Sequence, residues 1–234
     1  MYNGIKIKPP FFEVGPKAFL YGESALKLAK ALDRISAEYD VQIIFTPQYT
    51  DIHMLAQETE HLLIFAQHMD PLPVGRGLGS VLPEAVKAAG ATGVMLNHAE
   101  KPVDMETLEK TIKRADEIGL ATIVCADTPE DAAAIAKFSP NVIVTAPTSL
   151  IGTGTRSDDN YVLESIRTVK AVNPDVLVLQ GAGISNEDDV YNVIKLGAEA
   201  TGCTSGIIKA ADPIKMADAM IAAVRRAWDE RHNG

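Results

Sequence analysis

Short apolar runs alternate with longer amphipathic segments along the whole chain. Most of the runs are continuous and rich in β-branched residues, as strands buried on both faces of a parallel sheet should be. They lie at residues 4–8, 41–45, 62–66, 93–97, 121–125, 141–145, 176–180 and 199–203. The pattern therefore predicts eight short strands.

The segments between these runs have the periodicity of helices with one apolar face. Residues 23–39 place Leu26, Ala29, Leu32 and Ile35 on one stripe. Similar segments lie at residues 104–119, 128–138, 185–197 and 212–228, and a shorter one lies near 51–58.

Several of these segments carry signals for helix ends. Thr128 followed by Pro129 predicts a capped helix start, and Gly119 predicts a helix stop. Ser185 and Gly197 are expected to bound another helix in the same way.

Eight strand–helix units without an intervening linker predict a single (β/α)8 barrel domain over residues 1–234. The length of 234 residues fits one such barrel. The alternative is an open, doubly wound sheet. The strand count and the chain length favour the closed barrel over it.

Composition narrows the possible partners. The net charge of −9 argues against binding to nucleic acid or to an anionic membrane, but local N–H groups and one lysine can still hold a small anion. No apolar stretch is long enough to span a membrane, and the N-terminus lacks the apolar run of a signal peptide. With only Cys125 and Cys203, three strands apart and not expected to pair, a cytoplasmic location is predicted.

Glycine-rich loops follow the last strands of the predicted barrel, at the end where barrel active sites lie. Residues 152–154, 181–183 and 204–206 are small, so main-chain N–H groups can approach an anion. They predict a phosphate site, although Gly183 alone would also suit a plain tight turn.

Lys8 and His98 end two different predicted strands and would face the same mouth. An ammonium group neutralises a phosphorylated compound, and a neutral imidazole polarises a carbonyl and moves a proton between adjacent oxygens. Taken singly, a solvated lysine and a structural histidine are the simpler interpretations.

With these residues the chain resembles the triosephosphate isomerase family in its shorter, archaeal-type form. The motifs that carry the resemblance are "IKIK" (5–8), "FAQHMDP" (65–71), "VLPEAVKAAGATGVMLNHAEK" (81–101), "APTSLIGTG" (146–154), "NPDVLVLQGAGIS" (173–185) and "TSGIIKA" (204–210).

The resemblance implies a barrel enzyme that isomerises a small sugar phosphate without a cofactor, as a homodimer or homotetramer. It makes Lys8 the substrate-binding lysine, His98 the electrophile and Glu100 the acidic residue after it. Ile151 and Gly152 belong to the tip of a closing lid. Phosphate would be held by Gly183, Thr204 and Ser205.

The chain departs from this family at several positions. Family members carry a catalytic glutamate where this chain has Ala146, and an asparagine where it has Lys6. Lys6 is expected to bind the phosphorylated substrate together with Lys8, unless one of the two points into the barrel interior. The first loop, residues 9–22, is long, and its residues Phe11, Phe12 and Phe19 are expected to wall the pocket or form a subunit interface.

Three hypotheses explain Ala146. It is an introduced change that leaves a base-deficient, ligand-trapping form; or another carboxylate, from Glu13, Glu100 or Asp127, serves as base; or the protein binds a sugar phosphate without isomerising it. A barrel aldolase or synthase, with Lys8 forming a Schiff base, is a further alternative. No metal site is expected, because the histidines lack clustered ligand spacing and His68 with Asp70 is better explained as structural.

Overall fold

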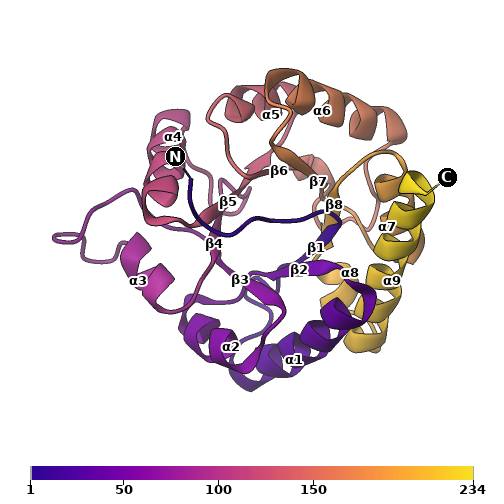
Figure 1. The fold of residues 1–234 in the computed structure, drawn as a ribbon, viewed down its shortest axis with the longest axis horizontal. Coiled ribbons are helices and arrows are strands. Elements are labelled where there is room, and N and C mark those ends of the chain that lie inside the picture. The colour runs from indigo at the N-terminus through magenta and orange to yellow at the C-terminus, as the bar shows by residue number, and fades with distance from the viewer. Residues whose placement is uncertain (1, 234) are drawn as a thin grey trace.

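Eight parallel strands close into a barrel, and helices cover its outer face (Figure 1). The computed structural model describes residues 2–233. Each strand pairs with the next, and β8 pairs with β1. The closed barrel confirms the predicted fold class and excludes the open sheet. The strands are β1 (Phe11–Val14), β2 (Gln42–Phe45), β3 (Leu62–Ala66), β4 (Gly93–Leu96), β5 (Ala121–Ala126), β6 (Val142–Thr145), β7 (Leu177–Gln180) and β8 (Ala200–Cys203).

The helices follow the strands in alternation. They are α1 (Gly22–Tyr39), α2 (Ile52–Glu58), α3 (Pro83–Ala88), α4 (Met105–Ile118), α5 (Pro129–Ala136), α6 (Asp159–Val172), α7 (Glu187–Lys195), α8 (Ser205–Ile208) and α9 (Pro213–His232), with short 3-10 turns η1 (Tyr49–Asp51) and η2 (Thr148–Leu150).

The predicted helix signals are mostly correct. The Thr128 side chain accepts a hydrogen bond from the main chain of Asp131, and Gly119 ends α4 in the left-handed conformation with φ of 73°. Ser185 is not the cap of α7; Asn186 is, and its side chain accepts from the Asp189 N–H.

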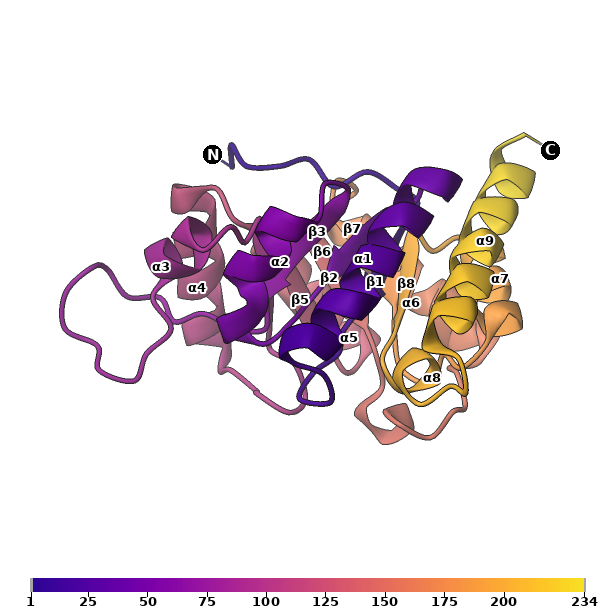
Figure 2. The ribbon, with the colours of Figure 1, turned by 90° about the horizontal axis from the view of Figure 1, so that it is seen from below.

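The first strand is not where the sequence pattern placed it. β1 is Phe11–Val14, not residues 4–8, which instead cross the amino-terminal end of the barrel (Figures 1 and 2). Ile7 is buried in the barrel interior there, while Lys6 and Lys8 are exposed. Residues 4–8, in which apolar and polar side chains alternate, therefore cover the amino-terminal end of the barrel. The fully buried FFEV run forms the first strand and pairs with β2 and β8.

The core has two layers, and β1 contributes to both. Phe11 points into the barrel, and Phe12 packs between the barrel and the helices. Neither is exposed, so the expectation that they form a subunit interface or wall the pocket is wrong. Phe19 differs, because its ring is 52% exposed at the pocket mouth.

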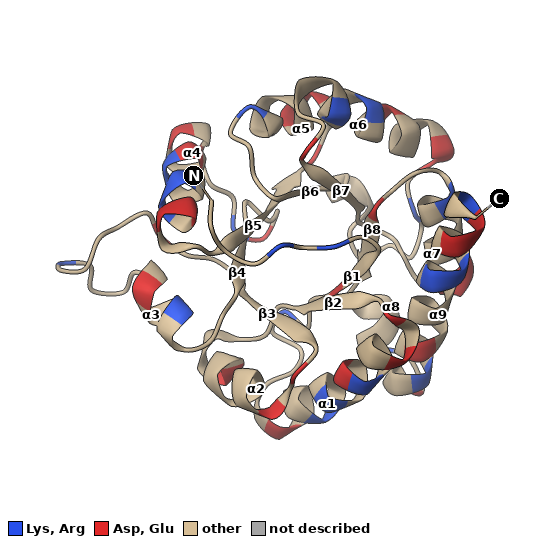
Figure 3. Cartoon of the chain, viewed as in Figure 1, with Lys and Arg blue, Asp and Glu red and all other residues tan. Residues whose placement is uncertain are grey.

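Charged residues are distributed over the outer helices (Figure 3). No helix within residues 2–233 is long and apolar enough to cross a membrane.

Candidate active site

A cavity of about 800 Å³ opens at the carboxyl-terminal ends of the strands. This is the end opposite the N-terminal segment, on the side of α8 in Figure 2. Of the predicted site residues, the cavity walls bring together His98, Glu100, Ala146, Ile151, Gly152, Gly183, Thr204 and Ser205. Lys6 and Lys8 do not line it.

Lys17 lies in the loop after β1 and lines the cavity, as do Lys101 and Lys209. Its Nζ is 2.6 Å from Glu100 Oε1. Its main-chain oxygen accepts hydrogen bonds from Gln48 Nε2 at 2.7 Å and Gln67 Nε2 at 3.0 Å, which fix the loop. Lys17 thus has the placement that was expected of Lys8, because β1 begins later than predicted and its carboxyl end lies at Val14. Lys17 directly follows the glycine and proline after the buried run, and this signal could have identified it.

Lys8 lies at the opposite end of the barrel. Its main-chain N–H donates to Gln42 Oε1, at the first residue of β2, at 2.9 Å. The assignments of Lys8 and Lys6 to the pocket are therefore corrected: both depended on a strand at residues 4–8 that does not form.

His98 is held in a defined tautomer at the pocket wall. Its Nδ1 accepts the Glu100 main-chain N–H at 3.1 Å, so the neutral ring carries its proton on Nε2. Burial, and then the neighbouring Lys17, lower the pKa of His98, while Glu100 opposes this. The preceding Asn97 has φ of 56°. Its side-chain Nδ2 donates a hydrogen bond to Cys125 O, and its Oδ1 accepts one from the Val103 N–H. These contacts fix the turn that directs the His98 ring to the pocket wall.

Glu100 serves mainly as the partner of Lys17. Its side chain is 62% exposed, and the hydrogen bond from Lys17 is the main cause of its lowered pKa. Glu100 therefore helps to place the ammonium group at the pocket.

Position 146 contributes only a methyl group to the pocket wall. The neighbouring Asp127 is engaged in the loop that follows β6, because its Oδ1 accepts the Thr148 N–H at 2.5 Å. Tyr161 further ties this region by donating to Asp127 O at 2.9 Å.

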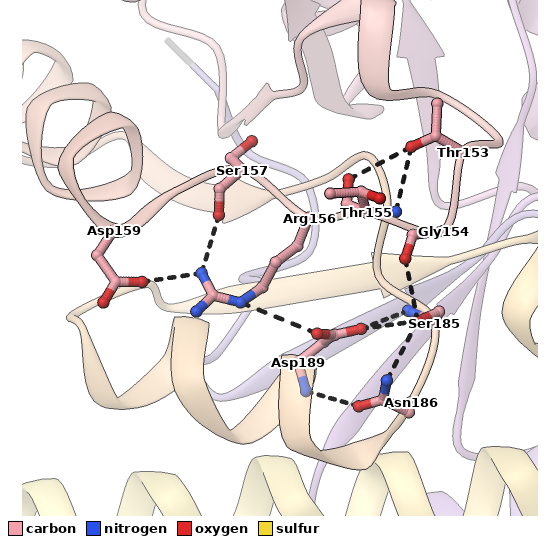
Figure 4. Close-up of polar contacts among 9 residues, drawn as sticks. All are labelled: Thr153, Gly154, Thr155, Arg156, Ser157, Asp159, Ser185, Asn186 and Asp189. Carbon is pink, nitrogen blue, oxygen red and sulfur yellow. Dashed lines mark hydrogen bonds and ion pairs between the residues drawn. The ribbon is translucent and has the colours of Figure 1, made fainter.

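The loop after β6, residues 146–158, is joined near its carboxyl end to the loop after β7, as Figure 4 shows. Arg156 donates to Asp159 Oδ1 at 2.9 Å and lies 3.9 Å from Asp189 Oδ1. The Ser185 hydroxyl donates to Asp189 Oδ2 at 2.8 Å, which joins the start of α7 to the same network.

Gly183 is required for this contact between the two loops. It has φ of 72°, and a Cβ there would lie 1.9 Å from Thr155 O. Glycine at position 183 lets the β6 loop approach the β7 loop, and Gly152 and Gly183 of these loops line the same cavity.

Glu13 is a buried carboxyl group on the cavity wall. Thr46 Oγ1 donates to its Oε1 at 2.7 Å. Burial raises the pKa of Glu13 to about 7, although Thr46 and Lys17 both act to lower it. The sequence had suggested Glu13 only as one of three possible bases.

No group of three or more His, Cys, Asp or Glu side chains within residues 2–233 is arranged to hold a metal ion. His68 Nε2 and Asp70 Oδ1 are 3.2 Å apart, a two-residue contact. Cys125 and Cys203 are both free and buried.

Comparisons with known proteins agree with the family resemblance seen in the sequence motifs. The sequence model of the family described as "Triosephosphate isomerase" matches residues 17–220. The triosephosphate isomerase of Methanobacterium bryantii is 41% identical over 197 residues, covering 83% of this chain and 87% of that protein. The enzyme of Saccharolobus solfataricus is 34% identical over 226 residues, covering 94% and 99%.

A solved structure shares the fold. The crystal structure of triosephosphate isomerase from Bartonella henselae superposes with a TM-score of 0.75 at 15% identity, covering 94% of this chain and 100% of that one.

Proposed function

Because this chain belongs to the triosephosphate isomerase family, we propose that its pocket binds a small phosphorylated sugar and interconverts the ketose and aldose forms. The observation that carries the proposal is the pairing of a cation and a neutral imidazole on one cavity. Lys17 and His98 both line it, and hydrogen bonds fix both the Lys17 loop and the His98 ring.

The roles follow from the chemistry of these groups. Lys17 balances the negative charge of the ligand, and the Nε2–H of His98 donates to the carbonyl oxygen as charge develops there. The loops at Gly183 and Thr204–Ser205 supply main-chain N–H groups for the phosphate. Residue 146 takes no part in proton transfer, because a methyl group cannot accept a proton.

A Schiff-base aldolase fits the pocket less well. That chemistry was expected of a buried lysine on a strand, and Lys8 does not line the cavity. The lysines that do line it, Lys17, Lys101 and Lys209, all lie beyond the strand ends.

Two lysine variants test the proposal. Lys17→Met should weaken binding of dihydroxyacetone phosphate about 10–100-fold, because a charge-assisted contact contributes about 1.5–3 kcal/mol. Lys8→Met is the matched control and should leave affinity unchanged. Isothermal titration calorimetry measures both, and equal affinity in the two variants would refute the role of Lys17 in binding.

We also propose that the chain forms a homo-oligomer through the loop between β3 and α3. Residues 73–80 are all exposed and protrude from the barrel (Figures 1 and 2), with Val74 70% exposed and Leu78 fully exposed. The Asp70 carboxylate accepts the Val81 N–H at 2.7 Å and closes the base of the loop. Covering such apolar side chains stabilises association by about 25 cal/mol per Å².

Leu78→Asp should therefore reduce the oligomer to monomer, as measured by light scattering after gel filtration. Val172→Asp, at a 40% exposed position on α6, is the control and should leave the mass unchanged. An oligomer that survives Leu78→Asp would place the interface elsewhere.

A further inference from the structure

Four acidic residues in the described part of the chain line the cavity: Glu13, Glu100, Asp127 and Asp131. Glu100 is paired with Lys17, and Asp127 accepts the Thr148 N–H at the start of the loop after β6. Asp131 is an exposed residue in the first turn of α5. Glu13 alone among them projects from a strand of the barrel wall.

The orientation of Glu13 follows from the alternation of β1. Phe11 belongs to the cluster inside the barrel, whereas Phe12 and Val14 belong to the cluster between barrel and helices. Glu13 therefore faces inward, on the side of Phe11, and its carboxyl group lies on the cavity wall.

Two glycines make room for this carboxyl group. A Cβ at Gly15 would lie 2.8 Å from Glu13 Oε1, and a Cβ at Gly202 would lie 3.0 Å from Glu13 Oε2. A larger residue at Gly15 would press on the carboxylate, and one at Gly202 would press on both the main chain and the side chain of Glu13. The wall is thus shaped around Glu13, and Thr46 fixes one of its oxygens.

Glu13 and Ala146 each adjoin a glycine that lies two residues before an expected phosphate-binding residue. Glu13 pairs with Gly202, two residues before Thr204. Ala146 adjoins Gly181, where a Cβ would be 3.3 Å from its methyl group, and Gly181 is two residues before Gly183. Both positions are therefore close to the main chain expected to hold phosphate.

Between these two positions the cavity wall includes two glycines, with Leu179 of β7 also lining the cavity. β7 and β8 separate β6 from β1, and they present Gly181 and Gly202 to the interior. A ligand held by the phosphate loops can therefore lie against the Glu13 side of the cavity as well as above Ala146.

The surroundings of Glu13 suit proton transfer near neutral pH. Its pKa is raised to about 7 by burial, close to the value at which a general base acts best. The ionisable groups around it are Lys17 on the loop after β1, Cys125 on β5 and Cys203 on β8. Burial raises the pKa of both thiols, to about 12 and about 11, so both are neutral there.

We propose that Glu13 is the catalytic carboxylate of this pocket, in place of the side chain missing at position 146. The proposal rests on the proposed isomerase function. Glu13 lies just before residues 17–220, the part of the chain that the family model matches.

The step balances without a further reactant. The Glu13 carboxylate takes a proton from the carbon beside the carbonyl, and the C–H electron pair forms a carbon–carbon double bond as His98 Nε2–H protonates the carbonyl oxygen. Glu13 then returns its proton to the neighbouring carbon. The hydroxyl on the carbon that first lost its proton gives a proton back to His98 as the new carbonyl forms.

Proton exchange in heavy water tests this proposal. Dihydroxyacetone phosphate, erythrulose 4-phosphate and ribulose 5-phosphate are followed by NMR with the unaltered chain and with Glu13→Gln. Glu13→Gln should slow exchange on the accepted substrate about 100-fold or more while its dissociation constant changes less than about threefold. The exposed Glu23→Gln, in the first turn of α1, is the control and should behave as the unaltered chain.

A second variant distinguishes catalysis from a structural role. The Thr46 hydrogen bond lowers the Glu13 pKa, so Thr46→Val should move the rising limb of the rate–pH profile from about pH 7 to higher pH. A merely structural Glu13 would leave that limb in place.

The outcomes separate the two proposals. Exchange that persists in Glu13→Gln, or sugar-phosphate binding without exchange in the unaltered chain, overturns the role of Glu13 and leaves the binding site standing. Failure of all three compounds to bind overturns the proposed function itself. Loss of exchange in Glu13→Gln with binding kept supports both.

Discussion

Introducing a glutamate at position 146 of the Glu13→Gln variant is expected to restore isomerisation about 10²–10⁴-fold, the usual contribution of a positioned acid–base group. The new carboxylate would project from the end of β6 into the same cavity as His98 and Lys17. The adjoining Gly181 leaves space, since its missing Cβ would contact the Ala146 methyl at 3.3 Å. The measurement is the isomerisation rate of the double variant against Glu13→Gln alone.

The matched control is Ala146→Gln in the same background. Glutamine has the shape of glutamate but cannot accept the proton, so it should restore nothing. If the glutamine and glutamate variants were equally active, residue 146 would act through packing, and if neither were active, the end of β6 would not be within reach of the reacting carbons.

The stability of the unaltered chain relative to Glu13→Gln is expected to fall by roughly 3 kcal/mol between about pH 4.5 and pH 7. The Glu13 carboxyl has a pKa of about 7 in the folded protein and 4.5 as its ordinary value. The difference of about 2.5 units at 1.36 kcal/mol each gives this figure.

The sign follows from which state holds the proton. Between these pH values the unfolded chain releases the proton while the folded chain retains it. The stabilisation is therefore complete below about pH 4.5 and is lost as the pH rises to about 7. Chemical unfolding of both proteins at pH 4, 6 and 8 measures the difference, and a constant difference would show that Glu13 is not buried as a neutral acid.

Much of the fold could be predicted because its signals are local. Seven strands begin and end within one residue of the predicted runs, since a continuous apolar run between polar segments has few other ways to be buried. Helix α6 was not predicted, although Asp158 caps it and Val162, Ser165 and Val169 form its buried face.

The pocket was predicted in part for the same reason. His98, Ala146 and Gly183 follow well-marked strands, and counting from those strands places them at the carboxyl ends. Lys17 and Glu13 depend on β1, whose boundaries the pattern misplaced.

The sequence by itself determined the strand–helix alternation, and with it the barrel, the end that holds the site, and the absence of a carboxylate at position 146. Only the tertiary structure decided that Lys17, not Lys8, reaches the cavity and that Glu13 is buried on its wall. The reason is that residues 4–8 and 11–14 are both short and apolar enough to form a strand. Barrel closure selects between them, because only one of the two segments can pair with both β2 and β8.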